Sequence, residues 1–387
     1  MTPAARIAAA AEVLDAIAGG LAAEPALSRW GRSNRFAGSG DRAAIRDHVF
    51  DALRCRRSFA ALGGGTSGRA LMLGMLRAQG RDPAEVFSGE GHAPAPLTAD
   101  EAAAGHLPTG AEALDLPDWI AADLEASLGA EFSPVCRAMQ ARADVFLRVN
   151  ALKATREEAR DALSAEGIAA EPHALAPMAL RVTSGARRLR NSAAFNEGMV
   201  ELQDAGSQAL CEDIPLPDAG AVLDYCAGGG GKSLALAARA PSLRYVAHDA
   251  HAQRMNDLPP RAARAGAQIE VSTGPQGEFE LVVADVPCSG SGAWRRQPEA
   301  KWRLDRDGLV ALTELQAQIL DECSAFVPKG GALAYVTCSL LAAENTAQAD
   351  SFLSRHPEWE LEHQRRLTPL DGADGFFLAV FRRSGRS

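Results

Sequence analysis

Apolar side chains recur every three or four positions through residues 4–80. Such spacing places them on one face of a helix, and Gly and Pro residues punctuate the joins between the repeats. We therefore predict an all-helical N-terminal domain. The positions that carry this spacing are Ile7, Val13, Leu14, Ile17 and Leu21, followed by Ala44, Ile45, Val49, Phe50 and Leu53.

A stretch rich in Pro, Gly and small residues follows at 87–111 and is typical of a linker, so we place the helical domain with its linker at 1–110. Short helical patterns at 119–128 and 134–140 then precede a strand, a helix and a second strand. Thr155 and Glu158 have the spacing of a capping box, and Gly167 marks the predicted end of that helix. We assign 111–214 to a small helix followed by an α+β module.

From residue 219 the pattern changes to alternating apolar strands and amphipathic helices, which predicts a parallel sheet with helices on both faces. Such sheets bind ligands at the carboxyl ends of their strands. We therefore place the catalytic domain at 215–387. The expected strands are 221–226, 243–248, 268–272, 280–285 and 331–337, and the expected helices are 232–240, 251–265, 308–327 and 343–355.

Composition narrows the function classes. No run of 18 apolar residues occurs, so no membrane-spanning helix is predicted. The N-terminal residues lack the apolar core of an export signal, and we expect a cytoplasmic protein with no membrane partner. The seven cysteines form no CxxC pair with zinc spacing, so we expect reduced thiols and no metal site.

The net charge of −9 hides clusters of arginine. Local patches create the field that attracts a nucleic acid, although a charge cluster is as often a solvated face. The largest cluster lies between Trp30 and Arg57 and contains Arg32, Arg35, Arg42, Arg46, Arg54, Arg56 and Arg57 against Asp41, Asp47 and Asp51.

A glycine loop follows the first strand of the predicted sheet, in the stretch VLDYCAGGGGKSLALA that begins at Val222. Glycines let a backbone approach a ligand at a helix N-terminus. Cys226 stands where a phosphate-binding loop of an NTPase needs its first glycine, so that class is disfavoured. Asp249 lies about 20 residues further on, the usual offset of a ribose-binding acid, although a helix N-cap is the plain alternative.

Two cysteines follow neighbouring predicted strands. Asp285 is the last residue of the strand expected at 280–285, and Cys288 lies three residues further on. Cys338 directly follows the strand expected at 331–337. A thiolate suits addition to an electron-poor ring carbon, and a second thiol suits the base that reverses the addition. We therefore predict that these side chains meet at one edge of the sheet.

These residues lie in motifs that resemble the RsmB/Nol/Sun family of RNA cytosine-5 methyltransferases, and within it the bacterial RsmB-like branch that acts on 16S rRNA. The resemblance covers about 145–383, and residues 1–80 are similar to its NusB-type helical domain. It implies a Rossmann-like class I S-adenosylmethionine-dependent methyltransferase domain preceded by an RRM-like module. The matching stretches are RVNALK from Arg148, VLDYCAGGGGKS from Val222, ADVPCSGSGAWRRQPEAKWR from Ala284 and YVTCSLLAAEN from Tyr335, supported by QDAGSQ from Gln203 and DGFF from Asp374.

The resemblance implies that Cys338 adds to cytosine C6, after which C5 accepts the methyl group of S-adenosylmethionine and leaves S-adenosylhomocysteine. Asp285 would bind the cytosine edge, Lys232 would help to hold the base, and Cys288 would assist release. The target cytosine must be single-stranded or flipped out, with rRNA as the expected partner. We expect a monomer.

The resemblance also assigns binding residues. Those assigned to the cofactor are Cys226, Ala227, Gly228, Gly229, Gly230, Gly231, Lys232, Asp249, Arg254, Thr273 and Asp285. Those assigned to RNA are Arg148, Asn150, Arg296, Lys301 and Trp302, although packing is the stronger interpretation for Trp302.

Two departures from the family pattern bear on the cofactor. Gly228 and Gly229 replace an Ala-Pro pair, and Ser272 or Thr273 stands near the place of an acid after the third strand, so we expect altered cofactor affinity. Alternatives are a tRNA cytosine-5 methyltransferase and a non-catalytic RNA-binding ribosome-assembly factor. A third alternative is methylation of an exocyclic amine. Enzymes of that class carry a polar-Pro-Pro-aromatic motif, and this chain has Asp285-Val286-Pro287-Cys288 in its place.

Overall fold

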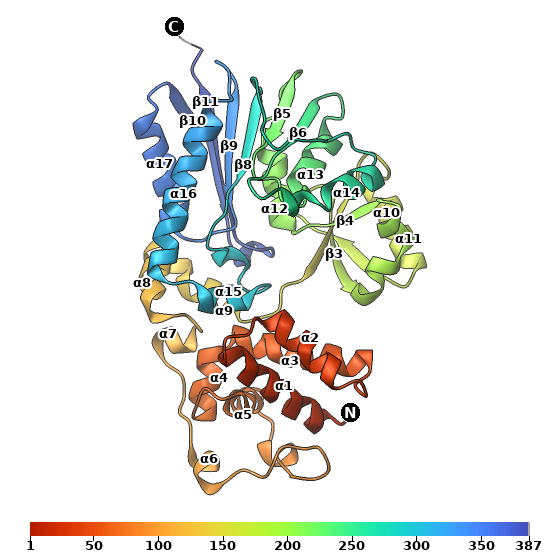
Figure 1. The fold of residues 1–387 in the computed structure, drawn as a ribbon, viewed down its shortest axis with the longest axis vertical. Coiled ribbons are helices and arrows are strands. Elements are labelled where there is room, and N and C mark those ends of the chain that lie inside the picture. Colours follow the sequence, from red (N-terminus) through yellow and green to blue (C-terminus); the bar gives the residue numbers. More distant parts are fainter. Residues whose placement is uncertain (386–387) are drawn as a thin grey trace. The chain divides into compact units, whose positions relative to one another are not determined.

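The computed structural model describes residues 1–385, which form two compact units (Figure 1). The helical unit comprises Met1–Arg142 together with Trp294–Asp305, and the sheet unit comprises Ala143–Ala293 together with the chain from Arg306 onward. These bounds differ from the three domains expected from the sequence. The helices expected at 119–140 lie in the helical unit, and so does a short segment of the expected catalytic domain.

The helical unit confirms the all-helical interpretation of residues 4–80. Helices α1 and α3 pack together, α1 also packs on α5, and Ile7, Val13 and Ile45 are fully buried between them. Gly74 allows α5 to approach α4, because a Cβ at this position would lie 1.8 Å from the carbonyl oxygen of Phe59. The α-helices are α1 (Pro3–Ala18), α2 (Ala23–Ser33), α3 (Ser39–Arg54), α4 (Arg56–Gly63), α5 (Gly68–Ala78), α6 (Ala99–Ala103), α7 (Gly110–Ala113), α8 (Asp118–Leu128), α9 (Phe132–Met139) and α15 (Pro298–Arg303).

The segment Trp294–Asp305 completes the helical unit by covering the end of α3. The last carbonyls of a helix lack partners within the helix. Here the Lys301 ammonium donates to the carbonyl of Arg54 (3.1 Å), and the Trp302 indole N–H donates to that of Leu53 (2.6 Å). A cation at this end also opposes the negative pole of the helix dipole. Side chains almost 250 residues away along the chain therefore cap α3.

The sheet unit begins with a small antiparallel sheet of order β2-β3-β1-β4. The predicted capping box of Thr155 and Glu158 is present, and Gly167 follows the helix with a φ of 73°. Strands β2 and β4 were not expected, because both are short. The elements are β1 (Val145–Val149), α10 (Arg156–Ala165), β2 (Ala169–Pro172), β3 (Ala179–Ser184), α11 (Ala193–Asn196), β4 (Val200–Leu202) and α12 (Ala205–Asp213).

The second sheet has the order β10-β11-β9-β8-β5-β6-β7, and the neighbours from β9 to β7 are parallel, as predicted. The antiparallel hairpin β10–β11 at its edge was not expected. The helix expected at 251–265 is divided, and only its second half, which begins near Pro259 and Pro260, is α-helical. The elements are β5 (Ala221–Asp224), α13 (Gly231–Arg239), β6 (Arg244–Ala247), α14 (Leu258–Ala265), β7 (Glu270–Val271), β8 (Leu281–Asp285), α16 (Arg306–Ser324), β9 (Ala332–Thr337), α17 (Thr346–Arg355), β10 (Trp359–Leu367) and β11 (Phe376–Arg383).

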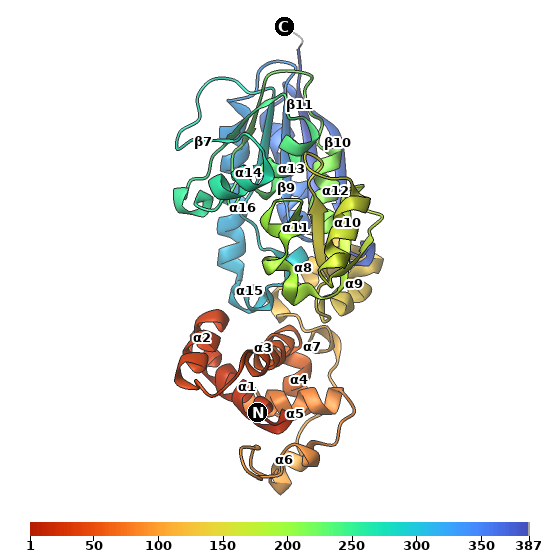
Figure 2. The same ribbon diagram turned by 90° about the vertical axis from the view of Figure 1, so that its right-hand side faces the viewer.

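Alternate residues of these strands face two separate cores, so helices cover both faces of the sheet (Figure 2). Val222 and Leu281 pack with α12 and α13 on one face. Leu223 and Val282 pack with α16 and α17 on the other. The doubly wound arrangement is confirmed, and it brings the carboxyl ends of β5, β6, β8 and β9 to a common edge.

The loops after β8 and β9 are held together by one buried carboxylate, that of Glu344. It accepts hydrogen bonds from the backbone N–H of Ser289 (2.7 Å), the side-chain amide of Gln316 (3.0 Å) and the hydroxyls of Ser289 and Ser339. Ser289 follows Cys288, and Ser339 follows Cys338. The carboxylate therefore fixes the residues next to both cysteines, and we call this set the Glu344 clamp.

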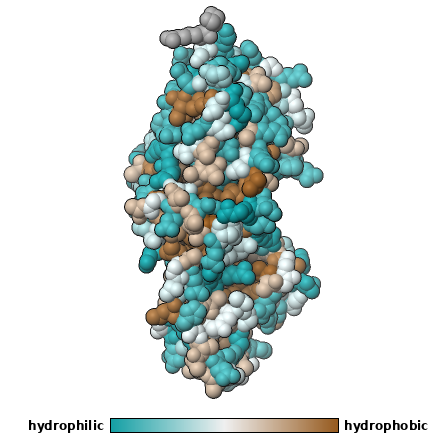
Figure 3. All heavy atoms as spheres, turned by 90° about the vertical axis from the view of Figure 1, so that its left-hand side faces the viewer, coloured by the Kyte–Doolittle hydropathy of each residue, from teal (hydrophilic) through white to brown (hydrophobic). Residues whose placement is uncertain are grey.

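The surface of the described residues is mixed in character. Apolar side chains on the face seen in Figure 3 form small patches among hydrophilic ones. No helix within residues 1–385 is both long enough and apolar enough to cross a membrane.

Replacement of Glu344 should destabilise the sheet unit. In Glu344→Ala the N–H of Ser289 and the amide of Gln316 lose a buried acceptor, each worth about 1–3 kcal/mol. We expect the free energy of unfolding to fall by about 3 kcal/mol or more, and by less in Glu344→Gln. Urea denaturation followed by circular dichroism measures this. The control is Glu360→Gln, at an exposed position. Equal denaturation curves for this variant and for Glu344→Ala would refute a stabilising role of the Glu344 clamp.

Lys301 predicts a pH dependence of stability. Burial lowers its pKa from 10.5 to about 8. The unfolded chain then binds more protons than the folded one between these values, so this group's contribution to stability increases as pH rises from 8 to 10.5, by up to about 3 kcal/mol. Lys301→Met should remove this increase. The measurement is the difference in unfolding free energy between wild type and variant at pH 7.5 and at pH 10, and a difference that does not change with pH would contradict the prediction.

Candidate active site

The glycine loop joins β5 to α13 at the edge where the parallel strands end. Its fold is set by hydrogen bonds from the N–H of Ala227 to the carbonyl of His248 and from that of Gly230 to Ala227, both 2.8 Å. Gly230 has a φ of 78°, and a Cβ there would lie 2.0 Å from Leu258. Glycine is therefore required at position 230 by both conformation and packing. Gly228 also has a positive φ, 51°, but a Cβ there would meet only Arg254, at 3.6 Å.

Asp249 is the second residue after β6 and holds the glycine loop. Its carboxylate accepts from the N–H of Gly228 (3.0 Å) and from that of His251 (2.9 Å), and it pairs with Arg254 (3.2 Å). Asp249 is buried, whereas the Arg254 side chain is about half exposed. The hydrogen bond to His251 closes a turn and is not the helix N-cap considered as the alternative, because the helix that follows has His251 at its N-cap. The bond to Gly228 links this acid to the loop.

Asp224 ends β5 beneath the same loop. One carboxylate oxygen accepts from the hydroxyl of Ser233 (2.5 Å), and the other is buried without a protein partner. Burial raises the pKa of Asp224 to about 6. An acceptor of this kind favours a polar donor from a ligand.

Lys232 and Asp285 form an ion pair of 2.6 Å between the start of α13 and the end of β8. Lys232 is buried, and its ammonium lies 6.0 Å from the centre of the Phe376 ring. Burial has the largest single effect and lowers the pKa of Lys232, but the charge of Asp285 and the hydrogen bond to it, together with the charges of Cys211 and Asp224, outweigh burial, so the pKa is raised. The Asp285 side chain keeps about a third of its surface exposed. The pair therefore combines a fixed cation with a carboxylate open to a ligand.

The sulfur atoms of Cys288 and Cys338 lie 3.4 Å apart. The hydrogen bond to Cys338 and then burial raise the pKa of Cys288 well above its usual value, so Cys288 keeps its proton at neutral pH. The N–H of Gly292 donates to the carbonyl of Cys338 (2.9 Å), and Gly292 packs so closely on Gly375 that a Cβ would lie 2.1 Å from its carbonyl oxygen. The prediction that the two cysteines meet at one edge is confirmed.

Arg148 and Asn150, which were expected near RNA, are buried. The Arg148 guanidinium donates to the carbonyl of Gly231 (2.8 Å) and to the side chain of Gln203. The Asn150 amide donates to the carbonyls of Gly198 (3.0 Å) and Ala265 (2.8 Å). Only 6% and 3% of their surfaces are exposed, and the contact with RNA suggested for both residues stays a prediction. Arg148 supports the glycine loop.

Lys301 and Trp302 are also engaged within the protein, as caps of α3. Lys301 is 4% exposed, and the contact with RNA suggested for it stays a prediction. The Trp302 ring is half-buried, in agreement with packing as its stronger interpretation. Arg296 is half-buried in the helical unit and Thr273 is exposed after β7, and the roles suggested for these two residues stay predictions.

Two functional features were missed at the level of sequence. Glu344 lies inside one of the matching motifs but was given no role, and the only signal was an acid seven residues after the end of a strand that is followed by polar side chains. Asp204 accepts from the N–H of Gly206 (2.8 Å) and of Asp374 (3.1 Å), and so ties together the two supporting motifs.

The site thus combines two touching thiols, a lysine–aspartate pair and a glycine loop backed by acids. This set can add a sulfur nucleophile to a ring and hold the edge of that ring by hydrogen bonds. No group of three or more metal-ligating side chains occurs within residues 1–385.

Comparison with known proteins locates the chain among methyltransferases. The family model described as 16S rRNA methyltransferase RsmB/F matches residues 215–382, and that of the RsmF/B-like ferredoxin-like domain matches residues 116–187. The ribosomal RNA small subunit methyltransferase B of Serratia proteamaculans (strain 568) is 33% identical over 282 residues, which cover 68% of this chain and 65% of that protein. The chain therefore spans 65% of the length of this curated relative.

Two solved structures share the fold. The crystal structure of PH0851 has a TM-score of 0.77 at 22% identity and covers 99% of both chains. That of a methyltransferase homolog protein from Pyrococcus horikoshii has a TM-score of 0.61 at 22% identity and covers 70% of this chain and 96% of that one. These two structures show the shared fold, and the matches in sequence show that the chain belongs to the RsmB/F family of methyltransferases.

Proposed function

We propose that this protein is an S-adenosylmethionine-dependent RNA methyltransferase that forms 5-methylcytosine. The observation that carries the proposal is the 3.4 Å contact between the sulfur atoms of Cys288 and Cys338 at the edge of the sheet. One thiol suffices for a simple nucleophile. Two thiols in contact suit a reaction in which a sulfur–carbon bond is first made and then broken.

The residues at the glycine loop fit the cofactor. Asp224 presents a buried acceptor without a protein partner, and a Cβ at Gly228 would meet only the Arg254 guanidinium, at 3.6 Å. Cys226, Ala227 and Gly228–Gly231 would face the cofactor, with Asp249 and Arg254 beside them at the end of β6. When bound, S-adenosylmethionine supplies an electrophilic methyl group.

Cys338 is the residue to which we assign the attack. As a thiolate it adds to cytosine C6, and the electron pair of the C5–C6 double bond becomes available at C5, which is otherwise a weak nucleophile. Because Cys288 retains its proton, it can donate a hydrogen bond to the Cys338 sulfur and so stabilise its thiolate form. The Glu344 clamp keeps both sulfur atoms in this arrangement.

The Lys232–Asp285 pair is assigned to the base. The Asp285 carboxylate accepts from the exocyclic amine of cytosine, and the Lys232 ammonium fixes the carboxylate and offsets negative charge that develops on the ring. The ion pair is partly open to solvent, so a base can reach it.

Cys288 is assigned to release. After methyl transfer, Cys288 gives up its own proton to solvent, and the resulting thiolate removes the proton from C5. The electron pair of the C5–H bond re-forms the C5–C6 double bond, and Cys338 leaves C6 as a thiolate. The raised pKa makes the thiolate of Cys288 scarce but strongly basic.

Ribosomal RNA is the substrate that we propose, because the curated relative of Serratia proteamaculans bears the name of a ribosomal RNA small subunit methyltransferase. A paired base cannot reach the two thiols, so the target cytosine must be single-stranded or flipped out of its helix. A cytoplasmic location follows from that substrate.

Removal of Cys288 should trap the enzyme on its substrate. Cys288→Ala can still form the Cys338–C6 bond but lacks the base that releases it, so the variant purified from cells should carry covalently bound RNA. A denaturing gel with nuclease treatment detects the adduct, and sequencing of the RNA names the cytosine.

Two variants serve as controls for this trap. Cys288→Ala/Cys338→Ala should carry no RNA, and Cys55→Ala, which changes a thiol of the helical unit, should behave as wild type. A folded Cys288→Ala protein without RNA, or an adduct that persists in the double variant, would refute the assigned roles.

Asp249 should contribute to cofactor binding. In Asp249→Ala the Gly228 N–H loses its partner and the cofactor loses an acceptor, so the Kd for S-adenosylmethionine measured by calorimetry should rise about tenfold or more. Glu270→Ala, on the exposed strand β7, is the control. An unchanged Kd in Asp249→Ala would place the cofactor elsewhere.

A further inference from the structure

The glycine loop contains four consecutive glycines, Gly228–Gly231, so its shape must be imposed by its surroundings. Glycine has the greatest backbone freedom of all residues, and a run of four therefore loses much conformational entropy when it becomes ordered. A site that is ordered before its ligand arrives binds that ligand more tightly, because the cost of ordering no longer opposes binding. The groups that order this loop are therefore candidates for residues that set the cofactor affinity.

One of these groups is the guanidinium of Arg261 on α14, which donates to the carbonyl of Gly229. Gly229 precedes Gly230, the N-cap of α13. The first carbonyl that a helix uses as an acceptor is that of its N-cap, so the carbonyl of Gly229 lies outside the hydrogen bonds of α13. Arg261 therefore supplies a donor to a carbonyl that the helix itself does not use.

Arg261 and Gly229 fit each other closely. A Cβ at position 229 would lie 2.9 Å from Nη1 of Arg261, whereas the φ of Gly229 lies outside the left-handed region. The missing side chain at position 229 therefore serves the approach of the guanidinium and not a backbone conformation that only glycine adopts.

The carboxylate of Glu201 on β4 holds this guanidinium in place. One of its oxygens accepts from Nε (3.2 Å) and Nη2 (2.8 Å) of Arg261, and the other pairs with Arg264. The remaining terminal nitrogen of Arg261, Nη1, is the one that donates to Gly229. Because the guanidinium is planar, its contact with Glu201 also fixes the direction of Nη1. Arg261 thus connects the small antiparallel sheet to the glycine loop in one defined arrangement.

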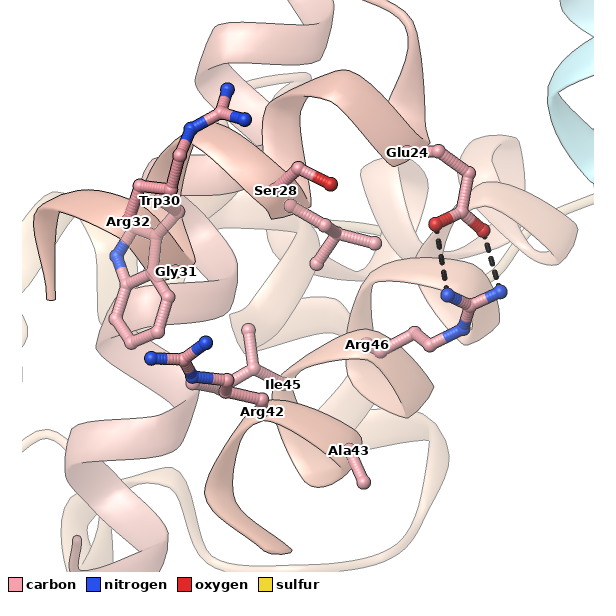
Figure 4. Close-up of a pocket in the computed structure, with 10 residues that line it drawn as sticks. Glu24, Ser28, Trp30, Gly31, Arg32, Arg42, Ala43, Ile45 and Arg46 are labelled. Atoms are coloured by element: carbon pink, nitrogen blue, oxygen red, sulfur yellow. Dashed lines mark hydrogen bonds and ion pairs between the residues drawn. The ribbon is translucent and has the colours of Figure 1, made fainter. Parts of the chain in front are cut away.

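Burial distinguishes this ion pair from an exposed one. Glu24 and Arg46 pair at the wall of a pocket between α2 and α3, where dashed lines mark the contact (Figure 4). Their side chains are 54% and 53% exposed, and pairs between exposed charges contribute little to stability. The side chain of Glu201 is only 4% exposed, and hydrogen bonds are stronger where water is excluded. The Glu201–Arg261 pair is therefore suited to hold a loop in place.

The small antiparallel sheet holds the loop at a second point. Arg148 lies directly opposite Glu201 in the register of β1 and β4, and it donates to the carbonyl of Gly231 (2.8 Å). Paired positions of this sheet thus act on the carbonyls of Gly229 and Gly231, one through Arg261 and the other directly. Two guanidinium groups therefore fix the part of the loop that leads into α13.

We propose that Arg261 is a positioning residue for the cofactor: held by Glu201, it fixes the Gly229 carbonyl and keeps the glycine loop in the shape that binds S-adenosylmethionine. The inference rests on the proposed function, which takes this loop as the cofactor site, and extends it to a residue outside the loop. Because Arg261 acts through the loop, its loss should change the affinity for the cofactor and not the chemical step.

Titration calorimetry of the full-length protein with S-adenosylmethionine measures this effect. Arg261→Ala removes all three donors, so the Kd should rise about tenfold. In methyl transfer to RNA, the KM for S-adenosylmethionine should rise by a similar factor, whereas kcat at saturating cofactor should not change.

Arg264→Ala is the matched control. Arg264 lies one turn further along α14 and pairs with the same carboxylate, but its guanidinium packs 4.5 Å from the centre of the Phe195 ring. This variant should bind S-adenosylmethionine as wild type does, although it also loses a bond to Glu201. Thermal unfolding verifies that both variants are folded. Equal Kd values for Arg261→Ala and Arg264→Ala would overturn the proposal.

A variant of the loop gives a second test, in which the effect should change sign. Gly229→Ala should displace the guanidinium of Arg261 and raise the Kd. In Gly229→Ala/Arg261→Ala no guanidinium is displaced and the added Cβ restricts the loop, so the Kd should be about two- to fivefold lower than in Arg261→Ala. An effect of the same sign in both backgrounds would contradict the proposal. If Arg261→Ala does not fold, Gly229→Ala alone decides, and an unchanged Kd overturns the proposal.

Methylation of RNA separates the two proposals. If wild type binds S-adenosylmethionine and forms 5-methylcytosine, and Arg261→Ala binds as Arg264→Ala does, only the further inference fails. If wild type binds S-adenosylmethionine but forms no 5-methylcytosine, the proposed function fails, and the Kd values still decide the role of Arg261. If wild type binds no S-adenosylmethionine, both proposals fail.

Discussion

The chemistry that we propose for this protein depends on a single buried carboxylate, that of Glu344. A thiol pair is useful only if its two members, which stand fifty residues apart, are held within contact distance in the absence of a covalent link. Backbone pairing between β8 and β9 brings the two loops close, but it ends before the cysteines. The donors that converge on Glu344 come from both loops and from α16. They therefore hold the two loops together beyond the point at which the strands stop pairing. In a buried site each such hydrogen bond is strengthened by the low dielectric and is costly to leave unmade.

The glycine loop is supported in a comparable manner from the small antiparallel sheet. Arg148 on β1 donates to Gly231 at the start of α13, and Gln203 joins the same carbonyl. The position of Lys232, one residue further on, is therefore tied to β1 as well as to β5. A small module that precedes the methyltransferase sheet in sequence contributes directly to the geometry of its first loop.

Local pattern predicted the strands and helices of the larger sheet, and strand ends then located Asp249, Asp285, Cys288 and Cys338, because parallel strands present their carboxyl ends at one edge. It could not predict which charged side chains are buried. Arg148 and Lys301 resembled surface cations, yet each donates to a carbonyl that is distant in sequence. Such partners are determined by tertiary packing. The local spacing of apolar residues contains no information about contacts that are distant in sequence. The β10–β11 hairpin was not predicted, because β10 is largely exposed and its apolar residues do not alternate regularly with polar ones.

The capping of α3 by Lys301 and Trp302 has a consequence for co-translational folding of the protein. Residues 1–142 emerge first, but the end of α3 obtains its caps only after residue 302 has itself emerged from the ribosome. By then β5, β6 and β8 have already left the exit tunnel, so the helical unit cannot reach its final state before much of the sheet unit exists. Translation order therefore makes the two units mature together, although each has its own apolar core.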